Sequence, residues 1–453
     1  MSDAADGARQ VAVADLVGTC ARIAGEGNVE RDVWLSDASG VGGRAPVVVK
    51  PGTAGEVREI VAWAYAHDVP IVPVGGASGY SGGIVPIDPR PSVAVALERL
   101  HRVRSFDPLL WRMEVEAGVR TATVQRLARE SGLLFPPDPG APEQSQIGGN
   151  LATNAGGPHA FKYGVTSRWV TGVEAVIAPG ELVTFGGPVR KDVAGYDLRS
   201  LLIGSEGTLG VITGAWLRLV PAPPMAIPVA ATYGSIPEGV RAIEAALGSG
   251  VVPATIEYLQ GTCLAYAPPP FLDVGDAAFV VICEAESEHE RDELLEALGA
   301  TAAVQDPKVL WRWRGGVSLA VRAAKGEKLA EDIAVPLHRL EEAITRSLEI
   351  GEAHRVEATS WGHAGDGNLH VSYLFDPDDR EEARRAEAAA TALFQLAREL
   401  GGTVSGEHGI GLLKGGQLLG QWSEAAVGAH EAVKRALDPK GLFNPGKKEP
   451  RPA

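Results

Sequence analysis

Cysteine is scarce in this chain, and the spacing of the few cysteines excludes two classes of site. The 453 residues contain three, Cys20, Cys263 and Cys283, and no two of them form a C-x-x-C pair. Three scattered thiols can neither ligate an iron–sulfur cluster nor build a disulfide framework. The scarcity is typical of proteins from a reducing compartment.

Long apolar runs and blocks of basic residues are also missing. No stretch approaches the ~18 uninterrupted apolar residues of a membrane-spanning helix, and no basic region precedes an apolar run near Met1, so we expect no membrane span and no secretory signal. The net charge is −15, without a Lys/Arg block, which argues against nucleic acid as a partner. We expect a cytoplasmic protein, and we retain peripheral contact with the inner face of the membrane as an alternative.

Glycine is abundant, and apolar residues suffice for a large core. The chain has 56 glycines, and 45% of its residues are hydrophobic and 22% charged, which is the composition of a globular protein. Its length allows two or three domains of roughly 150 residues. Much of the glycine lies in a few clusters, which indicates sites built from backbone.

Local patterns predict short strands mixed with helices. Thr53 and Glu56 form a capping box before apolar residues at helical spacing, and Pro70 follows that helix. A proline-rich break at 220–224 indicates a domain boundary. The further predicted strands are 71–74, 92–97, 113–117 and 278–283, and the further predicted helices are 121–131, 287–298 and 379–400. This pattern favours a mixed α+β fold.

The first glycine cluster, residues 73–83, follows a predicted strand. Successive backbone N–H groups in such a loop can form a nest for a pyrophosphate, and a flexible surface loop is the alternative. The spacing matches neither G-x-x-x-x-G-K-[ST] nor a G-x-G-x-x-G that opens a helix. The P-loop and Rossmann interpretations are therefore weak.

A third cluster, residues 193–213, ends in a β-rich run. The second cluster, residues 136–157, combines small residues with Asn and Thr. Backbone of this kind can lie flat against a planar ring and offer N–H and C=O groups to its edge. A tight structural turn is the alternative.

In order and spacing, the three clusters resemble the FAD-binding domain of the vanillyl-alcohol oxidase and p-cresol methylhydroxylase superfamily. The rest of the chain resembles the family of FAD-linked D-2-hydroxy-acid dehydrogenases that contains the glycolate oxidase flavoprotein subunit and D-lactate dehydrogenase. The resemblance implies an α+β protein in which a p-cresol methylhydroxylase-type FAD-binding domain precedes an FAD-linked oxidase C-terminal (cap) domain. The implied layout is a segment packed on the FAD domain (1–44), the FAD domain (45–222), the cap domain (223–420) and a segment that returns to the FAD domain (421–453).

The resemblance also implies the FAD contacts. In this family the first loop wraps the pyrophosphate, and the second and third segments line the isoalloxazine and the ADP portion. The implied FAD-binding residues are Pro73, Gly75, Gly76, Ala77, Ser78, Gly79, Tyr80, Ser81, Pro137, Asp138, Gly148, Gly149, Asn150, Thr153, Asn154, Gly156, Gly157, Tyr163, Gly164, Glu206, Gly207, Gly210, Val211, Ile212 and Asn444.

Histidines gather in two glycine-rich motifs, residues 362–370 and 405–411. Two histidines and one carboxylate leave open positions on a divalent ion for a substrate, although a lone His beside Gly is more often a structural hydrogen-bond donor. The resemblance implies that His363, His370 and Glu407 bind a metal, which we expect to be Zn²⁺ or Mn²⁺. It implies that His408 is the catalytic base.

Candidate substrate cations lie in and after the segment 310–318. A bidentate contact to a carboxylate suits Arg best. The resemblance favours Arg314 with Ser318 and Lys328 as substrate-binding residues, and an alignment shifted by two residues would favour Arg312 instead. A surface cation stacked on Trp is the alternative for either arginine.

The activity implied by the resemblance is the oxidation of a D-2-hydroxy acid, such as glycolate or D-lactate, to the 2-oxo acid, with hydride transfer to flavin N5. Electrons would leave to an external acceptor: an iron–sulfur subunit, a quinone, a cytochrome or an electron-transfer flavoprotein. One alternative is an alkylglycerone-phosphate synthase, but that enzyme carries a run of histidines where this chain has Glu407-His408. The other is a noncatalytic flavin- or metal-binding protein.

FAD should be bound noncovalently. No His or Cys lies between Gly75 and Gly83, so the first loop offers no side chain of the kind that attaches flavin in some relatives. Acid or heat should release FAD from the purified yellow protein into the supernatant, where absorbance measures it. Flavin that stays with the denatured chain would contradict this prediction.

Overall fold

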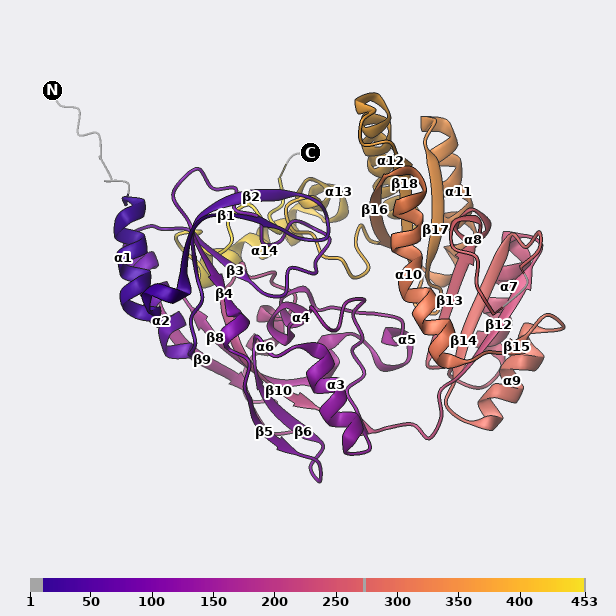
Figure 1. Cartoon of the computed structure of the whole chain (residues 1–453), viewed down its shortest axis with the longest axis horizontal. Coiled ribbons are helices and arrows are strands. Elements are labelled where there is room, and N and C mark those ends of the chain that lie inside the picture. Colours follow the sequence, from indigo (N-terminus) through magenta and orange to yellow (C-terminus); the bar gives the residue numbers. More distant parts are fainter. Residues whose placement is uncertain (1–10, 272–273, 452–453) are drawn as a thin grey trace.

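The computed structural model describes residues 11–271 and 274–451, which form two lobes side by side (Figure 1). We call residues 11–222 with the C-terminal segment 421–451 the N-terminal lobe, and residues 223–271 and 274–420 the cap lobe. Each lobe has its own sheets and its own clusters of buried apolar side chains. The α+β fold class predicted from the sequence is confirmed.

The N-terminal lobe contains two main sheets. The four-stranded sheet has the order β1-β2-β4-β3 and the antiparallel five-stranded sheet the order β5-β6-β10-β8-β9. The strands are β1 (Val29–Ser36), β2 (Gly42–Val49), β3 (Ile71–Val74), β4 (Val93–Ala96), β5 (Val103–Asp107), β6 (Arg112–Glu116), β8 (Val170–Ile177), β9 (Glu181–Gly186) and β10 (Val211–Arg218), with the short pair β7 (Leu133–Leu134) and β11 (Val220–Pro221). The helices are α1 (Val13–Ala24), α2 (Ala54–Ala66), α3 (Thr121–Glu130), α4 (Ile147–Thr153), α5 (Ala160–Tyr163) and α6 (Leu198–Leu202).

Helix α2 shows how the sequence specifies these elements. The Thr53 side chain accepts a hydrogen bond from the Glu56 backbone N–H at 3.1 Å, which satisfies one of the free donors at the helix start. The apolar residues at helical spacing, from Val57 to Tyr65, are buried against β2, β4 and α1. The helix predicted at this position is confirmed.

The cap lobe is built on one seven-stranded sheet in the order β15-β12-β14-β13-β17-β18-β16. Its strands are β12 (Ile227–Tyr233), β13 (Thr255–Gln260), β14 (Phe279–Ala285), β15 (Ala303–Val304), β16 (Glu327–Ala334), β17 (Glu357–His363) and β18 (Asn368–Phe375). Its helices are α7 (Ile236–Gly248), α8 (Gly261–Tyr266), α9 (Glu288–Leu298), α10 (Pro307–Lys325), α11 (Leu340–His354) and α12 (Arg380–Glu399).

The two faces of the cap sheet have different roles. Side chains of α7, α9, α11 and α12 pack on one face, and α8 and α10 pack on the other. Because side chains alternate along a strand, Leu369 and Val371 enter the first core while His370 points to the second face. That face also carries Trp361 and His363 and is turned toward the N-terminal lobe.

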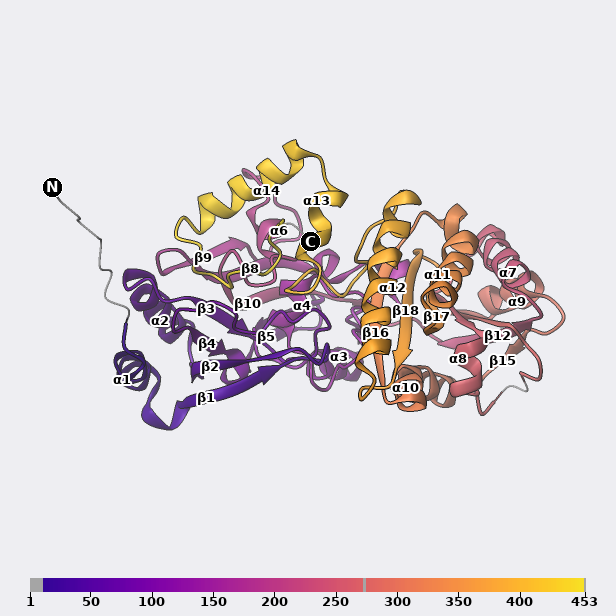
Figure 2. The same ribbon diagram turned by 90° about the horizontal axis from the view of Figure 1, so that it is seen from above.

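Helix α14 (Glu424–Leu437) packs on the N-terminal lobe through Val433 and Leu437, and Figure 2 shows it in yellow. The short helix α13 (Leu418–Gln421) contacts the cap core through Leu418. Phe443 forms a parallel bridge with Ile71 at the start of β3. The Lys434 ammonium donates to the carbonyl oxygens of Thr208 and Phe443, at 2.7 and 3.0 Å. These contacts of the C-terminal segment thus support β3, the strand that leads into the first glycine cluster.

The predicted helices and strands agree with the structure to within two residues at their ends. The segment around Arg314 had no predicted secondary structure and forms the long helix α10. Within the described part of the chain, no helix combines the length and the apolar composition needed to cross a bilayer.

Candidate functional site

A cavity of about 410 Å³ lies between the lobes and is lined by both. The N-terminal lobe contributes the first two glycine clusters and, from the third, only Glu206, Gly207, Gly210 and Ile212. The first part of the third cluster does not line the cavity, and its Val193 and Tyr196 are exposed. The cap lobe contributes β16, β17, β18, α10 and the loop that carries Glu407 and His408. The residues predicted from separate motifs therefore line one cavity.

The first and second glycine clusters contact each other, and at Gly76 the contact leaves no room for a side chain. A Cβ on Gly76 would clash with the carbonyl oxygen of Gln144, and one on Gly75 would lie 3.4 Å from the Cα of Gly149. The Asp37 carboxylate accepts the backbone N–H groups of Gly82 and Gly83, at 2.9 and 3.2 Å. The loop after β3 is thus a fixed backbone structure rather than a flexible surface loop.

Most of the predicted FAD-binding residues line the cavity. These are Pro73, Gly75, Gly76, Ala77, Ser78, Gly79, Tyr80, Ser81, Asp138, Gly148, Gly149, Asn150, Thr153, Gly156, Gly157, Glu206, Gly207, Gly210 and Ile212. Lining residues outside the predicted set include Asp37, Gly83, Ile84, Leu97, Gln146, Trp311, Glu331 and Trp361.

Six predicted FAD-binding residues lie outside the cavity lining: Pro137, Asn154, Tyr163, Gly164, Val211 and Asn444. Several of them have structural contacts instead. Asn444 donates through Nδ2 to the carbonyl oxygens of Gly83 and Glu206, at 2.9 and 2.8 Å. The Tyr163 hydroxyl donates to Glu286 at 2.5 Å. These side chains support the glycine loops or join the lobes.

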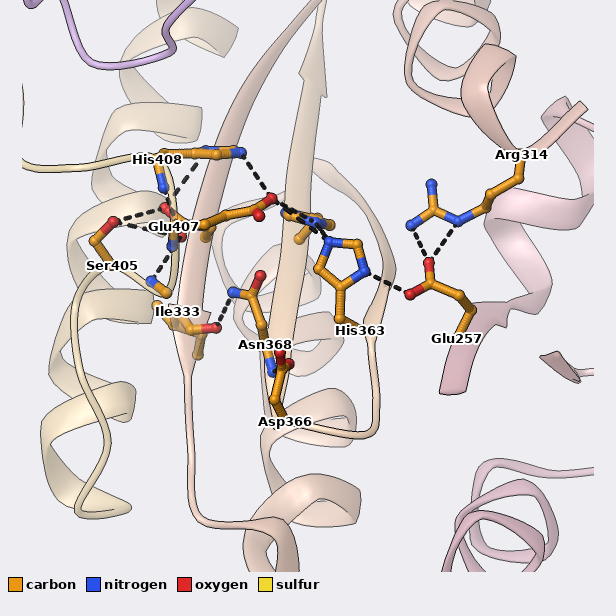
Figure 3. Close-up of polar contacts among 12 residues, drawn as sticks. Glu257, Arg314, Ile333, His363, Asp366, Asn368, Ser405, Glu407 and His408 are labelled. Atoms are coloured by element: carbon orange, nitrogen blue, oxygen red, sulfur yellow. Dashed lines mark hydrogen bonds and ion pairs between the residues drawn. The ribbon is translucent and has the colours of Figure 1, made fainter. Parts of the chain in front are cut away.

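His363, His370 and Glu407 converge on one point, and Figure 3 shows the side chains of His363 and Glu407 directed toward each other. The Nε2 atoms of the two histidines are 3.3 Å apart, and each lies 3.5 Å from Glu407 Oε1. A metal ion at about 2.0–2.1 Å from tetrahedral ligands has neighbouring ligand atoms about 3.3–3.4 Å apart. Two imidazole nitrogens and one carboxylate oxygen at these separations fit three of four positions around such an ion.

The electrostatics of this cluster also suit a cation. Burial alone would lower the pKa of His363, but Glu257 and Glu407 outweigh burial and raise that pKa well above its ordinary value. Burial and the charge of His363 lower the pKa of His370 to about 3, so its ring is neutral. Burial would raise the pKa of Glu407, but the histidines lower it to about 2. The cluster therefore offers an ionised carboxylate and a neutral imidazole where positive charge is favoured.

His408 lies directly beside this cluster. Its ring stacks between Tyr80 and His370, with centroid distances of 4.6 and 5.3 Å. Its Nε2 lies 4.0 Å from Glu407 Oε1, and its Nδ1 lies 3.4 Å from Asp332 Oδ1. That buried Nδ1 has no hydrogen-bond partner among the described residues. The ring is held by stacking, with one nitrogen toward a carboxylate and the other toward the ligand cluster.

Asp332, which no sequence motif indicated, fixes the loop that carries Glu407 and His408. One carboxylate oxygen accepts the backbone N–H groups of Gly406, Glu407 and His408, at 2.6, 2.6 and 3.2 Å. The other oxygen accepts the Lys414 ammonium at 2.6 Å. Burial opposes ionisation, but Lys414 and His408 hold the pKa of Asp332 far below its ordinary value.

The three predicted substrate-binding residues also line the cavity, and helix α10 brings Arg314 and Ser318 one turn apart. Lys328 donates to the Ser318 hydroxyl at 2.8 Å and lies 4.8 Å from the centroid of the Trp361 ring. Arg312 is exposed and does not line the cavity, so the helix brings Arg314, not Arg312, to the site.

The Arg314 guanidinium is already paired inside the protein. Its Nε and Nη2 donate to Glu257 Oε2, at 2.8 and 2.6 Å. Glu257 is fully buried, and its other oxygen lies 2.5 Å from His363 Nδ1. Like Asp332, Glu257 was not predicted from a motif. The one available signal was an acidic residue at the centre of the otherwise mostly apolar strand Thr255–Gln260.

Two family models match the chain. The FAD binding domain matches residues 45–186, and the domain described as FAD linked oxidases, C-terminal domain, matches residues 223–448. The glycolate oxidase subunit GlcD of Bacillus subtilis (strain 168) is 33% identical over 439 residues, which cover 93% of each chain. The D-lactate dehydrogenase of Anaerostipes hadrus is 31% identical over 431 residues, which cover 89% of each chain.

Solved structures show the same fold. A crystal structure of p-cresol methylhydroxylase with substrate bound superposes with a TM-score of 0.78 over 96% of each chain, at 15% sequence identity. At this identity the likeness concerns the fold alone.

His363→Ala, His370→Ala and Glu407→Ala should each lose bound metal and activity while they retain FAD, because all three residues belong to the cap lobe and none is part of the glycine clusters. Elemental analysis and flavin absorbance of the purified variants measure both contents. A chelator should lower wild-type activity, and Zn²⁺ or Mn²⁺ should restore it.

The matched control is His289→Ala, which changes an exposed histidine of the same lobe. It should keep both metal and FAD. Active wild-type protein with clearly less than about one equivalent of metal would contradict the metal site.

Proposed function

The chain belongs to the family of FAD-linked oxidoreductases that contains the glycolate oxidase subunit GlcD, and from this premise we propose that it oxidises a D-2-hydroxy acid, such as glycolate or D-lactate, to the 2-oxo acid. One observation carries the proposal. The cluster of His363, His370 and Glu407 lies beside His408 and two cations, on the wall that faces the glycine loops. Oxidation of an alcohol next to a carboxylate needs a base for the hydroxyl proton and a cation for the carboxylate.

FAD would be held by the backbone of the glycine clusters, where the lining residues Gly75, Gly76 and Gly157 add no side chain to the cavity. When bound, FAD supplies a hydride acceptor at N5. His363, His370 and Glu407 would hold a divalent metal. When bound, the metal supplies a Lewis acid that lowers the pKa of the substrate hydroxyl and orients the substrate.

The contacts of His408 support its proposed role as the general base. The carboxylate of Asp332 favours a proton on Nδ1, 3.4 Å away, and this leaves the Nε2 lone pair toward the ligand cluster. Nε2 would accept the proton of the substrate hydroxyl. Stacking between Tyr80 and His370 keeps the ring in this orientation.

Two cations are available for the substrate carboxylate. Lys328 forms no ion pair with a carboxylate among the residues that the structure describes, and its only polar side-chain contact there is the neutral Ser318 hydroxyl. Burial lowers the pKa of Lys328 to about 8, so the ammonium is still mostly charged at pH 7. Arg314 shares its charge with Glu257 and can donate through Nη1, which the bonds to Glu257 do not use. Both groups would orient the substrate for the base.

Electrons would leave to an external acceptor, such as an iron–sulfur subunit, a quinone, a cytochrome or an electron-transfer flavoprotein. The three cysteines are buried and far apart in sequence, so they cannot ligate an internal iron–sulfur relay.

Under anaerobic conditions, a D-2-hydroxy acid should bleach the flavin absorbance of the metal-loaded protein. Glycolate, D-lactate and D-2-hydroxyglutarate are the acids to compare, since the substrate side chain is the open question. L-lactate is the matched control. If its carboxylate and hydroxyl bind in the same places, its Cα hydrogen is no longer directed at the hydride acceptor. If none of the three acids reduces the flavin, the proposed function is wrong.

His408→Asn should lower the rate of flavin reduction by roughly 10²–10⁴-fold, the usual contribution of a general base. Substrate affinity should change much less, because Arg314 and Lys328 still bind the carboxylate. Arg314→Ala should have the opposite pattern, with weaker binding first and a smaller loss at saturation. Stopped-flow absorbance of the flavin measures both quantities. Near-normal reduction by folded, FAD-loaded His408→Asn would exclude His408 as the base.

A further inference from the structure

Glu257 is a fully buried carboxylate in β13, near the middle of the cap sheet. Its neighbours across the sheet are His363 on β17 and Ile282 on β14. A charge in such a place carries a large desolvation cost, which its partners must offset. Both of its main partners belong to the candidate site, which suggests a role there.

The two oxygens of Glu257 have different partners (Figure 3). Oε1 lies 2.5 Å from Nδ1 of His363, and Oε2 accepts Nε and Nη2 of Arg314, at 2.8 and 2.6 Å. Among the residues that the structure describes, no other charged side chain pairs with this carboxylate. One residue thus bridges the candidate metal cluster and the candidate substrate cation.

The contact with His363 determines which nitrogen faces the metal cluster. A carboxylate at Nδ1 requires N–H there, so the proton is held on Nδ1 and Nε2 is turned toward His370 and Glu407. Carboxylates in this position orient metal-ligating histidines and make them better ligands, and their loss commonly weakens metal binding 10–100-fold.

The contact with Arg314 fixes the guanidinium in a similar way. Two of its nitrogens are bound to one oxygen of Glu257, so the plane of the group is set and Nη1 is the nitrogen left for a substrate carboxylate. Arg314 is about 10% exposed and would otherwise be a buried charge without a partner.

We propose that Glu257 is a positioning residue that holds a metal ligand, His363, and the substrate cation, Arg314, in one arrangement. The proposal rests on the proposed function, because it assumes that the cluster binds metal and that Arg314 binds the carboxylate of the hydroxy acid. It adds that a single side chain, which does not act on the reacting atoms, determines the positions of both His363 and Arg314.

Glu257→Gln tests this arrangement sharply because an amide has only one acceptor oxygen. The charged Arg314 should retain that oxygen, and the amide NH₂ would then face His363 Nδ1. An NH₂ donor there favours the tautomer with its proton on Nε2, the nitrogen that faces the cluster. The affinity of FAD-loaded protein for Zn²⁺ should therefore fall 10–100-fold, measured by competition with a chromophoric chelator.

Arg314→Met is the matched control, because it removes the other partner of Glu257 and leaves the bond to His363. Its Zn²⁺ dissociation constant should stay within about threefold of the wild-type value, while its KM for D-lactate rises. Saturating Zn²⁺ should restore much of the kcat of Glu257→Gln. That restoration would show that Glu257 acts through the metal site and not on the reacting atoms.

Folded, FAD-loaded Glu257→Gln that binds Zn²⁺ as tightly as wild type would overturn this inference and leave the proposed function standing. Wild-type protein that binds no Zn²⁺ would overturn both the metal site and this inference. If Glu257→Gln fails to retain FAD, the double variant Glu257→Gln/Arg314→Met removes both buried charges. The same loss of Zn²⁺ affinity relative to Arg314→Met is expected there, and equal affinity would again overturn the inference.

Discussion

The cavity depends on one loop, residues 405–411, which is held from both lobes by buried carboxylates. Asp332 of the cap sheet accepts three backbone N–H groups at its start. Glu206 of the N-terminal lobe accepts the N–H groups of Ile410 and Gly411 at its end, at 2.9 and 2.5 Å. Backbone N–H groups that face a buried carboxylate are strongly held. Glu407 and His408 lie between these two anchors, so the position of the candidate ligand and base is set jointly by both lobes.

These anchors explain why so much charge is buried around the site. Asp332 is paired with Lys414, Glu257 with Arg314, and Glu206 with Lys448 at 3.1 Å. Pairs of this kind add little stability compared with apolar residues of similar size, because desolvation offsets their attraction. Their effect is geometric, since each carboxylate holds a backbone segment or a functional side chain in one place.

The sequence predicts the backbone part of the site better than its supporting side chains. Glycine clusters and glycine-flanked histidines are local patterns, and most of them contribute residues to the cavity lining, although the segment 193–198 does not. Glu257 and Asp332 act through strand register, which pairs Glu257 with His363 and Asp332 with His370 across long stretches of sequence. No local pattern encodes that register. The sequence also left open whether Arg312 or Arg314 reaches the cavity, because the orientation of helix α10 determines this.

The two lobes form their sides of the cavity by different physical means. In the N-terminal lobe the cavity wall is mostly backbone, which suits a cofactor whose shape is large and constant. In the cap lobe Glu257, His363, His370 and Lys328 stand on the adjacent strands β13, β17, β18 and β16. A slip of one residue in any of these strands would turn its functional side chain into the opposite core. The contact of Leu369, Val371 and Tyr373 with that core opposes such a slip. The apolar packing behind the sheet is therefore what keeps the polar cluster in front of it in register.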